Sequence, residues 1–317
     1  MKKILVLIIV LSNIVFASDY KAKLLGNTKG DLIVKENIQE IHPFASLTKL
    51  MTAVLVIEEV DKGNFSYDNI VTVPKEALKY KGSTINLATG QKVKLNDLLY
   101  ATLVHSANDA AYTMAHFVSK GNLEKFVDNM NKKAKEIGML NTTYFTPHGL
   151  PTSMTGLDLD RGTAFDIYKL SLYAMKKPKL MEVVGTKSIK IIDGKRTIQN
   201  RNSLVGKVEG VTGLKTGYHD DSMYNISISF TKDKEDYVAV LFGGKNATIR
   251  DGEMTKTIKT FVPPQKKDVA TYIKEDINLY KNKSLIYFGD EASVIINFLR
   301  EGKELNNNAF DKVIVIE

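Results

Sequence analysis

The order in which strand-like and helical segments follow one another is the feature that most constrains the fold of this 317-residue chain. Two strand-like runs, 22–25 and 32–35, flank a turn signal and predict a β-hairpin. Apolar periodicity then predicts helices over 47–60, 95–104, 107–118, 123–137, 163–175 and 253–261, and alternation predicts strands over 224–231 and 237–243. This order favours an α/β (α+β) fold in which helices flank an antiparallel sheet, in one domain that extends to about residue 262.

Residues 1–17 have the layout of a secretory signal peptide, with a basic start, an apolar run over 4–16 and small residues up to Ala17. An uncleaved membrane anchor is the alternative. The apolar run is short for a bilayer and contains Ser12 and Asn13, which favours cleavage after Ala17. We therefore expect export to the periplasm or to the outer face of the cytoplasmic membrane.

The composition excludes several classes of function. Cysteine is absent, which excludes disulfide scaffolds, cysteine zinc sites, iron–sulfur clusters and thiol catalysis. The histidines show no helical ligand spacing such as HExxH, so we expect neither a metal nor another cofactor. Without the two lysines of residues 1–17 the formal charge falls from +8 to +6. The remaining charge is spread along the chain, which favours wall polymer or anionic lipid over nucleic acid as a binding partner.

A change in composition near residue 263 predicts a second, smaller unit. Pro263 and Pro264 open a linker, and residues 268–317 are expected to form a small C-terminal module. Strand-like runs at 284–288 and 312–317 predict that it is β-rich, whereas 294–299 fits a strand or a helix.

Three short motifs occur in order in the larger unit: Ser46-Leu47-Thr48-Lys49, Ser106-Ala107-Asn108 and Lys215-Thr216-Gly217. The S-x-x-K pattern recurs at Ser18 and Ser229, but only Ser46 stands at the start of a long apolar helix. The other two motifs occur once each. Their order and spacing, more than any single motif, indicate a nucleophilic serine site.

The residue types suit that chemistry. Serine is a poor nucleophile until a base takes its proton, and residues three apart on a helix share a face, so Lys49 can reach Ser46. Lysine acts as a base only if its pKa falls, which burial and a second cation such as Lys215 would both favour. Ser106 can relay a proton to the leaving group, and Asn108 can hold the substrate backbone or Lys49.

The third motif fits a strand at a sheet edge. An extended substrate can pair with such a strand, Gly217 permits its close approach, and Lys215 and Thr216 can hold a carboxylate. Each motif alone also fits a structural role: Ser46 as an N-cap, Lys49 as a solvated residue, 106–108 as a helix cap and 215–217 as a turn. The ordered set in an exported, cysteine-free chain favours catalysis.

The sequence resembles the low-molecular-mass penicillin-binding proteins, the serine-type D-Ala-D-Ala carboxypeptidases, over residues 20–262. The segments that carry the resemblance are 42–53, 97–100, 106–111, 147–150, 200–202 and 213–218, and they include the S-x-x-K, S-x-N and K-T-G motifs. The resemblance implies a β-lactamase/transpeptidase-like catalytic domain over 18–262, with an all-helical subregion beside the sheet.

The resemblance also implies a reaction. Ser46 would attack the carbonyl between the two terminal D-alanines of a peptidoglycan stem peptide, with Lys49 as general base and water as the final acceptor. The backbone N–H groups of Ser46 and Tyr218 would form the oxyanion hole, and β-lactams would acylate Ser46 as mimics. Arg201 and Arg250 are further candidates for contact with the substrate carboxylate.

Two features depart from the family pattern. Ser222-Met223 stands where the family usually has Ala-Gly, so Met223 is expected to alter the entry of the strand or the wall of the site. The tail after Pro264 is shorter than the usual β domain and ends in a strand-like run, which argues against anchoring by a basic amphipathic helix.

Three alternatives remain open at the level of sequence. A class A β-lactamase shares the motifs but needs an E-x-x-L-N glutamate, and the run 136–141 has one residue too many for it. An endopeptidase that cleaves D-Ala cross-links would use the same site. A catalytically silent wall-binding protein would need an altered site, for which Met223 is the candidate change.

Overall fold

The computed structural model of the protein describes residues 18–262, 285–288 and 313–316. The predicted signal peptide at 1–17, the linker from 263 and the ambiguous run at 294–299 lie outside the described residues.

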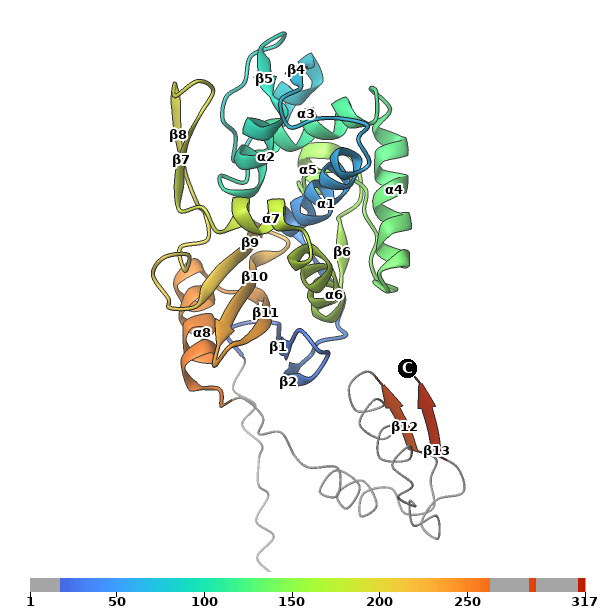
Figure 1. Cartoon of the computed structure of the whole chain (residues 1–317), viewed down its shortest axis with the longest axis vertical. Coiled ribbons are helices and arrows are strands. Elements are labelled where there is room, and N and C mark those ends of the chain that lie inside the picture. The colour runs from blue at the N-terminus through green and yellow to red at the C-terminus, as the bar shows by residue number, and fades with distance from the viewer. Residues whose placement is uncertain (1–17, 263–284, 289–312, 317) are drawn as a thin grey trace, which may run out of the picture.

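An antiparallel sheet forms the centre of the described part of the chain, with five strands in the order β2-β1-β11-β10-β9 (Figure 1). The strands are β1 (Ala22–Asn27), β2 (Leu32–Glu36), β9 (Val211–His219), β10 (Met223–Lys232) and β11 (Glu235–Gly244). The N-terminal hairpin joins the C-terminal strands through β1 and β11, where Leu24 pairs with Val240. The predicted hairpin and the predicted antiparallel sheet are both confirmed, and β9 lies at the edge of this sheet.

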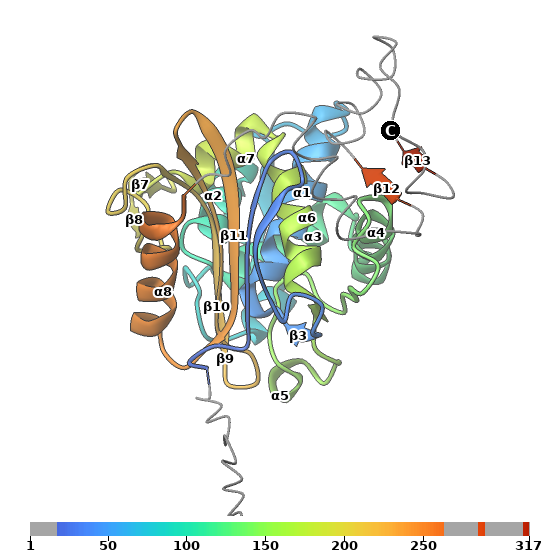
Figure 2. The same cartoon turned by 90° about the horizontal axis from the view of Figure 1, so that it is seen from below.

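Both faces of the sheet are covered by helices, as Figure 2 shows edge-on. Helix α8 (Ala247–Thr260) packs on one face, while α1 (Thr48–Asp61) and α6 (Ala164–Met175) lie on the other. Successive residues of a strand point to opposite faces, so Tyr237 packs toward α8 while Val238 joins the core shared with the helices. Burial on both faces explains why residues 237–243 read as a nearly continuous apolar run.

The remaining helices form the all-helical subregion beside the sheet. They are α2 (Leu95–Leu103), α3 (Asn108–Val118), α4 (Leu123–Glu136), α5 (Thr152–Thr155) and α7 (Pro178–Val184), with the 3-10 turns η1 (Ala45–Leu47) and η2 (Lys75–Lys79). Side-chain caps fix the starts of α4 and α6, because Asn122 accepts from the Lys125 N–H before α4 and Thr163 accepts from the Asp166 N–H before α6.

Short strand pairs complete the fold. They are β3 (His42–Pro43) with β6 (Arg161–Gly162), β4 (Ile70–Thr72) with β5 (Lys92–Lys94), and β7 (Ser188–Ile191) with β8 (Arg196–Gln199). In the tail, β12 (Leu285–Phe288) and β13 (Val313–Ile316) pair in parallel, which confirms the two strand predictions there. None of the helices in the described residues has the length and apolar character needed to cross a membrane.

One helix begins earlier than predicted. Helix α8 starts at Ala247, six residues before the expected start at 253, because the Asn246 side chain caps the Ile249 N–H. Gly252 interrupts the apolar pattern that sequence periodicity detects. Apart from its chain neighbours and the backbone of its own helix, no atom lies within 4 Å of where its Cβ would be.

Candidate active site

Ser46 lies in η1, the short turn that leads into α1. The residue at the N-cap of α1 is Leu47, and no side chain caps that helix, so the alternative reading of Ser46 as an N-cap is wrong. The Ser46 hydroxyl instead accepts a hydrogen bond from the Lys49 ammonium, with 2.8 Å between Oγ and Nζ. The predicted pairing of a hydroxyl and an amine on one turn is confirmed.

Lys49 is fully buried, which overturns the alternative of a solvated helix residue. Its Nζ donates to Ser46 Oγ, to Asn108 Oδ1 at 2.8 Å and to the backbone carbonyl of His148 at 2.6 Å. Burial lowers the pKa of Lys49 to about 7, although the carboxylates of Asp160 and Asp109 act in the opposite direction. A pKa near neutrality leaves much of the amine unprotonated, as a general base requires.

Lys215, on β9, is the second buried lysine, and its Nζ donates to the Thr216 carbonyl at 2.9 Å. Burial holds the pKa of Lys215 well below its usual value, and the positive charges of Lys49, Arg250 and Arg201 add to the effect. The sequence predicted that Lys215 would lower the pKa of Lys49. In the structure burial is the main cause of the lowered pKa of Lys49, and the charge of Lys49 in turn lowers the pKa of Lys215.

The second motif joins the helical subregion to the site. Ser106 has a φ of 66°, a left-handed conformation that is uncommon for serine and marks a constrained turn. Asn108 accepts from Lys49 through Oδ1 and donates from Nδ2 to the Lys81 carbonyl at 2.7 Å. Its backbone N–H donates to the Ser83 carbonyl at 2.7 Å, so Asn108 fixes the 81–83 segment against Lys49.

The third motif lies on the edge strand, as predicted. A Cβ atom at Gly217 would stand 2.7 Å from the Phe44 carbonyl oxygen and 3.1 Å from the Ser46 nitrogen. Glycine therefore lets β9 approach the nucleophile turn more closely than a residue with a side chain would allow. The Asn225 amide donates to the Pro43 carbonyl at 2.8 Å and fixes the same turn to the sheet.

A cleft of about 900 Å³ runs along β9 and opens beside Ser46. Of the predicted site residues, Ser46, Ser106, Asn108, Arg201, Thr216, Gly217, Tyr218 and Arg250 line this cleft, whereas Lys49 and Lys215 are buried. Met223 is not among the described residues that line this cleft. It is the first residue of β10 and has a φ of 53°.

The two arginines lie in the cleft wall, held by neighbouring groups. The Arg201 N–H donates to the Val104 carbonyl at 2.9 Å, and its guanidinium lies 3.4 Å from Nε2 of His105. Arg250 is buried and pairs with Asp251 at 2.7 Å. The two guanidinium groups contribute positive charge to this part of the cleft, and Lys215 lies buried next to it.

Two residues of the site were not named from the sequence. His148 contributes the carbonyl that binds Lys49, and the run 147–150 was noted only as part of the family resemblance. Asp160 is buried and accepts four hydrogen bonds, from Thr48, Phe145 and twice from Thr146, while burial raises its pKa to about 6. No local pattern marks Asp160, because its partners come from distant segments.

Residues 18–246 match a protein family whose description is D-alanyl-D-alanine carboxypeptidase. The chain belongs to this family. It is 32% identical over 240 residues to the D-alanyl-D-alanine carboxypeptidase DacF of Bacillus subtilis, an alignment that covers 75% of this chain and 60% of the relative. The chain thus spans about 60% of the length of the first curated relatives that it matches.

Solved structures of similar proteins share the fold. Penicillin-binding protein D2 of Listeria monocytogenes, in its ampicillin-bound form, matches with a TM-score of 0.69 and 26% identity, over 76% of this chain and 96% of that one. The carboxypeptidase DacD of Francisella tularensis matches with a TM-score of 0.70 and 26% identity, over 77% and 70% of the two chains. The predicted fold class is confirmed.

Proposed function

We propose that the protein is a serine D-Ala-D-Ala carboxypeptidase that removes the terminal D-alanine from peptidoglycan stem pentapeptides. The observation that carries the proposal is the contact of 2.8 Å between the Ser46 hydroxyl and a buried Lys49 whose pKa is about 7. This pair borders a cleft along an edge strand, where an extended peptide can add to the sheet.

Acylation follows from this arrangement. Neutral Lys49 accepts the Ser46 proton while Oγ attacks the carbonyl between the two D-alanines. The N–H groups of Ser46 and Tyr218 hold the oxyanion, a contribution of about 3 kcal/mol for one such donor. Ser106 donates its proton to the departing amine and takes the proton that Lys49 holds, so both return to their starting forms as D-alanine leaves. Water then attacks the ester with Lys49 again as base, which restores the Ser46 hydroxyl and releases the shortened peptide.

The positive part of the cleft suits the terminal carboxylate of the substrate. Thr216 lines the cleft, Lys215 is buried next to it, and Arg201 and Arg250 stand in the same wall. Arginine binds carboxylates through paired N–H groups, so the arginines orient the end of the peptide while Ser46 meets its last amide. A β-lactam carries a carboxylate and a reactive amide in one compact molecule, and we propose that it acylates Ser46 in the same way.

A β-lactamase is the second candidate, and one observation disfavours it. Glu136, the nearest match to the deacylating glutamate, ends α4 and pairs with Lys133 at 2.8 Å. The described residues that line the cleft do not include Glu136. Cleavage of D-Ala cross-links would use the same groups and remains a second use of the site.

The proposal includes the place where the enzyme acts. Residues 1–17 would direct export, the domain 18–262 would act in the periplasm or on the outer face of the cytoplasmic membrane, and residues 268–317 would form the small module. The substrate supports this location, since the peptidoglycan stem peptide lies outside the cytoplasm.

Two measurements on the purified protein test the function. Mass spectrometry after incubation with benzylpenicillin should map a persistent adduct to Ser46, and a stem pentapeptide should release D-alanine. Ser46→Ala should abolish both, whereas the control Ser153→Ala, which alters another serine of the cleft, should keep both. Rapid turnover of penicillin would favour the β-lactamase, and no release of D-alanine by folded protein would favour a wall-binding role.

A further inference from the structure

We propose that a second pocket, next to the catalytic cleft, binds an N-acetylated sugar of the glycan strand that carries the stem peptide. This inference rests on the proposed function, because the sugar belongs to the same substrate. The pocket has a volume of about 400 Å³ and is lined by residues of α3 and α4 and of the segments 145–148 and 155–157. Among the described residues, none lines both this pocket and the cleft.

Two buried side chains of the pocket carry polar atoms without a partner. His148 is 1% exposed and Tyr112 is 7% exposed. The Leu150 N–H donates to His148 Nδ1 at 3.3 Å, so the ring carries its proton on Nε2. In the part of the chain that the structure describes, neither this Nε2–H nor the Tyr112 hydroxyl makes a hydrogen bond. A buried donor without a partner is costly, which indicates that a ligand atom meets it here.

Two carboxylates stand at the rim of the pocket. Glu124 and Asp128 are exposed, lie one turn apart on the same face of α4, and both line the pocket. No lysine or arginine is found among the described residues that line it. This set of charges disfavours anionic ligands, whereas hydroxyl groups or an ammonium group can donate to the carboxylates.

An N-acetylated sugar supplies both kinds of partner. Its acetamide carbonyl accepts from the Nε2–H of His148, and its hydroxyl groups donate to Glu124 and Asp128. A simple ammonium would satisfy the carboxylates but leave the His148 donor unpaired. The apolar face of the sugar ring packs on Tyr80, whose ring centroid lies 4.5 Å from that of His148 and 5.2 Å from that of Tyr112. An apolar wall with a few placed polar groups is the usual form of a ligand pocket.

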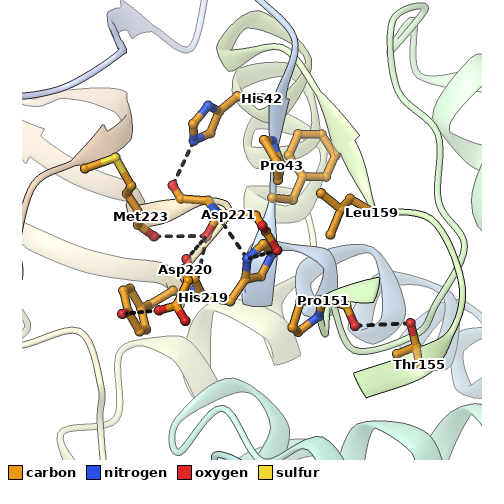
Figure 3. A network of polar contacts seen from close by, with 12 residues as sticks. His42, Pro43, Pro151, Thr155, Leu159, His219, Asp220, Asp221 and Met223 are labelled. Carbon is orange, nitrogen blue, oxygen red and sulfur yellow. Dashed lines mark hydrogen bonds and ion pairs between the residues drawn. The ribbon is translucent and has the colours of Figure 1, made fainter. Parts of the chain in front are cut away.

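The pocket lies across one wall of the cleft, the segment 150–159. Leu159 and Pro151 line the cleft, whereas Thr155 and Leu157 line the pocket. The Thr155 hydroxyl donates to the Pro151 carbonyl at 3.2 Å, which fixes this turn between the two hollows (Figure 3). A chain that leaves the cleft over this segment therefore reaches the pocket.

The length of the stem peptide suits this path. The reacting carbonyl belongs to the fourth residue of a pentapeptide, so four residues, or roughly 13 Å of extended chain, connect it to the glycan. The direct way through the protein is short. The Lys49 ammonium contacts the Ser46 hydroxyl at 2.8 Å and the His148 carbonyl at 2.6 Å, and the His148 ring lines the pocket. One substrate molecule can thus occupy the cleft and the pocket together.

The test compares kcat/KM for D-alanine release from a pentapeptide and from the same pentapeptide that carries its N-acetylated disaccharide. The added hydrogen bonds predict that the disaccharide form is preferred by about three- to tenfold. The gain should appear in KM with kcat unchanged, because the sugar contact does not change during the reaction. Glu124→Ala with Asp128→Ala should bring the ratio close to one. Glu40→Ala with Glu209→Ala, which removes two exposed acids outside the pocket, should keep it.

Free sugars give a readout that does not depend on catalysis. In an NMR titration of the full chain, N,N′-diacetylchitobiose should bind and shift the signals of the His148 ring. Cellobiose has hydroxyl groups in place of the acetamido groups, so it should bind at least about threefold more weakly, because it lacks the carbonyl that accepts from Nε2–H. The double variant of Glu124 and Asp128 should weaken the binding of diacetylchitobiose.

The outcomes separate the inference from the function. If neither peptide releases D-alanine while diacetylchitobiose binds in preference to cellobiose, the proposed function fails and the sugar site stands. If both peptides are cleaved with equal kcat/KM, the sugar site is overturned and the function stands. A double variant that keeps the preference for the disaccharide form at an unchanged melting temperature overturns the sugar site as well. Equal binding of the two free sugars has the same consequence and needs no variant.

Discussion

The pKa of Lys49 makes the rate of acylation depend on pH in a way that can be calculated. With a pKa of about 7, roughly 10% of Lys49 is neutral at pH 6, about half at pH 7 and about 90% at pH 8. Only the neutral amine can accept the Ser46 proton. The second-order rate constant for acylation by benzylpenicillin should therefore rise about tenfold from pH 6 to pH 8 and then level off.

A stopped-flow or quenched labelling assay between pH 5 and pH 10 measures this profile. A lysine with its usual pKa near 10.5 would give a rate that still increases about tenfold for each pH unit at pH 9. Such a continued rise, or a rate that does not change between pH 5 and pH 9, would refute the assignment of Lys49 as the base.

A charge-preserving variant provides the control for that profile. Arginine does not lose its proton in proteins, so Lys49→Arg should block acylation at every pH while the positive charge remains. Lys62→Arg, at the exposed end of the same helix, should acylate at the wild-type rate. Near-normal acylation by Lys49→Arg would place the base elsewhere.

Three further variants test the surroundings of the site. Asp160→Asn removes a charge that raises the pKa of Lys49, so the midpoint of the pH profile should move to lower pH. Thermal melting should show a free energy of unfolding lower by about 1–3 kcal/mol, because the backbone N–H groups of Phe145 and Thr146 then donate to a neutral amide oxygen in place of a carboxylate. Gly217→Ala should slow acylation at least about tenfold by displacing β9 from the nucleophile turn, whereas Gly252→Ala should not; equal rates would contradict the close approach. Glu136→Gln should leave the lifetime of the penicillin adduct unchanged, and a longer lifetime would revive the β-lactamase reading.

The sequence predicted the elements of the fold well where periodicity is strong. The helices that became α2, α3, α4 and α6 were placed within one residue of their starts, because each has an apolar stripe and a clear break before it. The short pairs such as β7 with β8 were not predicted, since β8 contains a single apolar residue, Ile198, among its four.

Residues of the candidate site also differ in whether the local sequence predicts their contacts. The contact between Ser46 and Lys49 depends on residues of one turn, and the sequence alone predicts it. Tertiary packing brings the His148 carbonyl and the Asp160 carboxylate to Lys49. Both residues lie about one hundred positions further along the chain, and no local sequence pattern relates them to Lys49. The cause of the lowered Lys49 pKa, burial more than a second cation, also required the packed structure.

The attachment of the 81–83 segment to Asn108 has a consequence for drug tolerance. The backbone of this segment binds both the N–H and the side-chain amide of Asn108, whose other end holds Lys49. A substitution that shifts the segment would thus move an acceptor of the Lys49 ammonium without substituting any residue of the three motifs. On the proposed function, slower inhibition by β-lactams would then follow from changes at surface positions around Lys81, where an inspection restricted to the three motifs would find nothing.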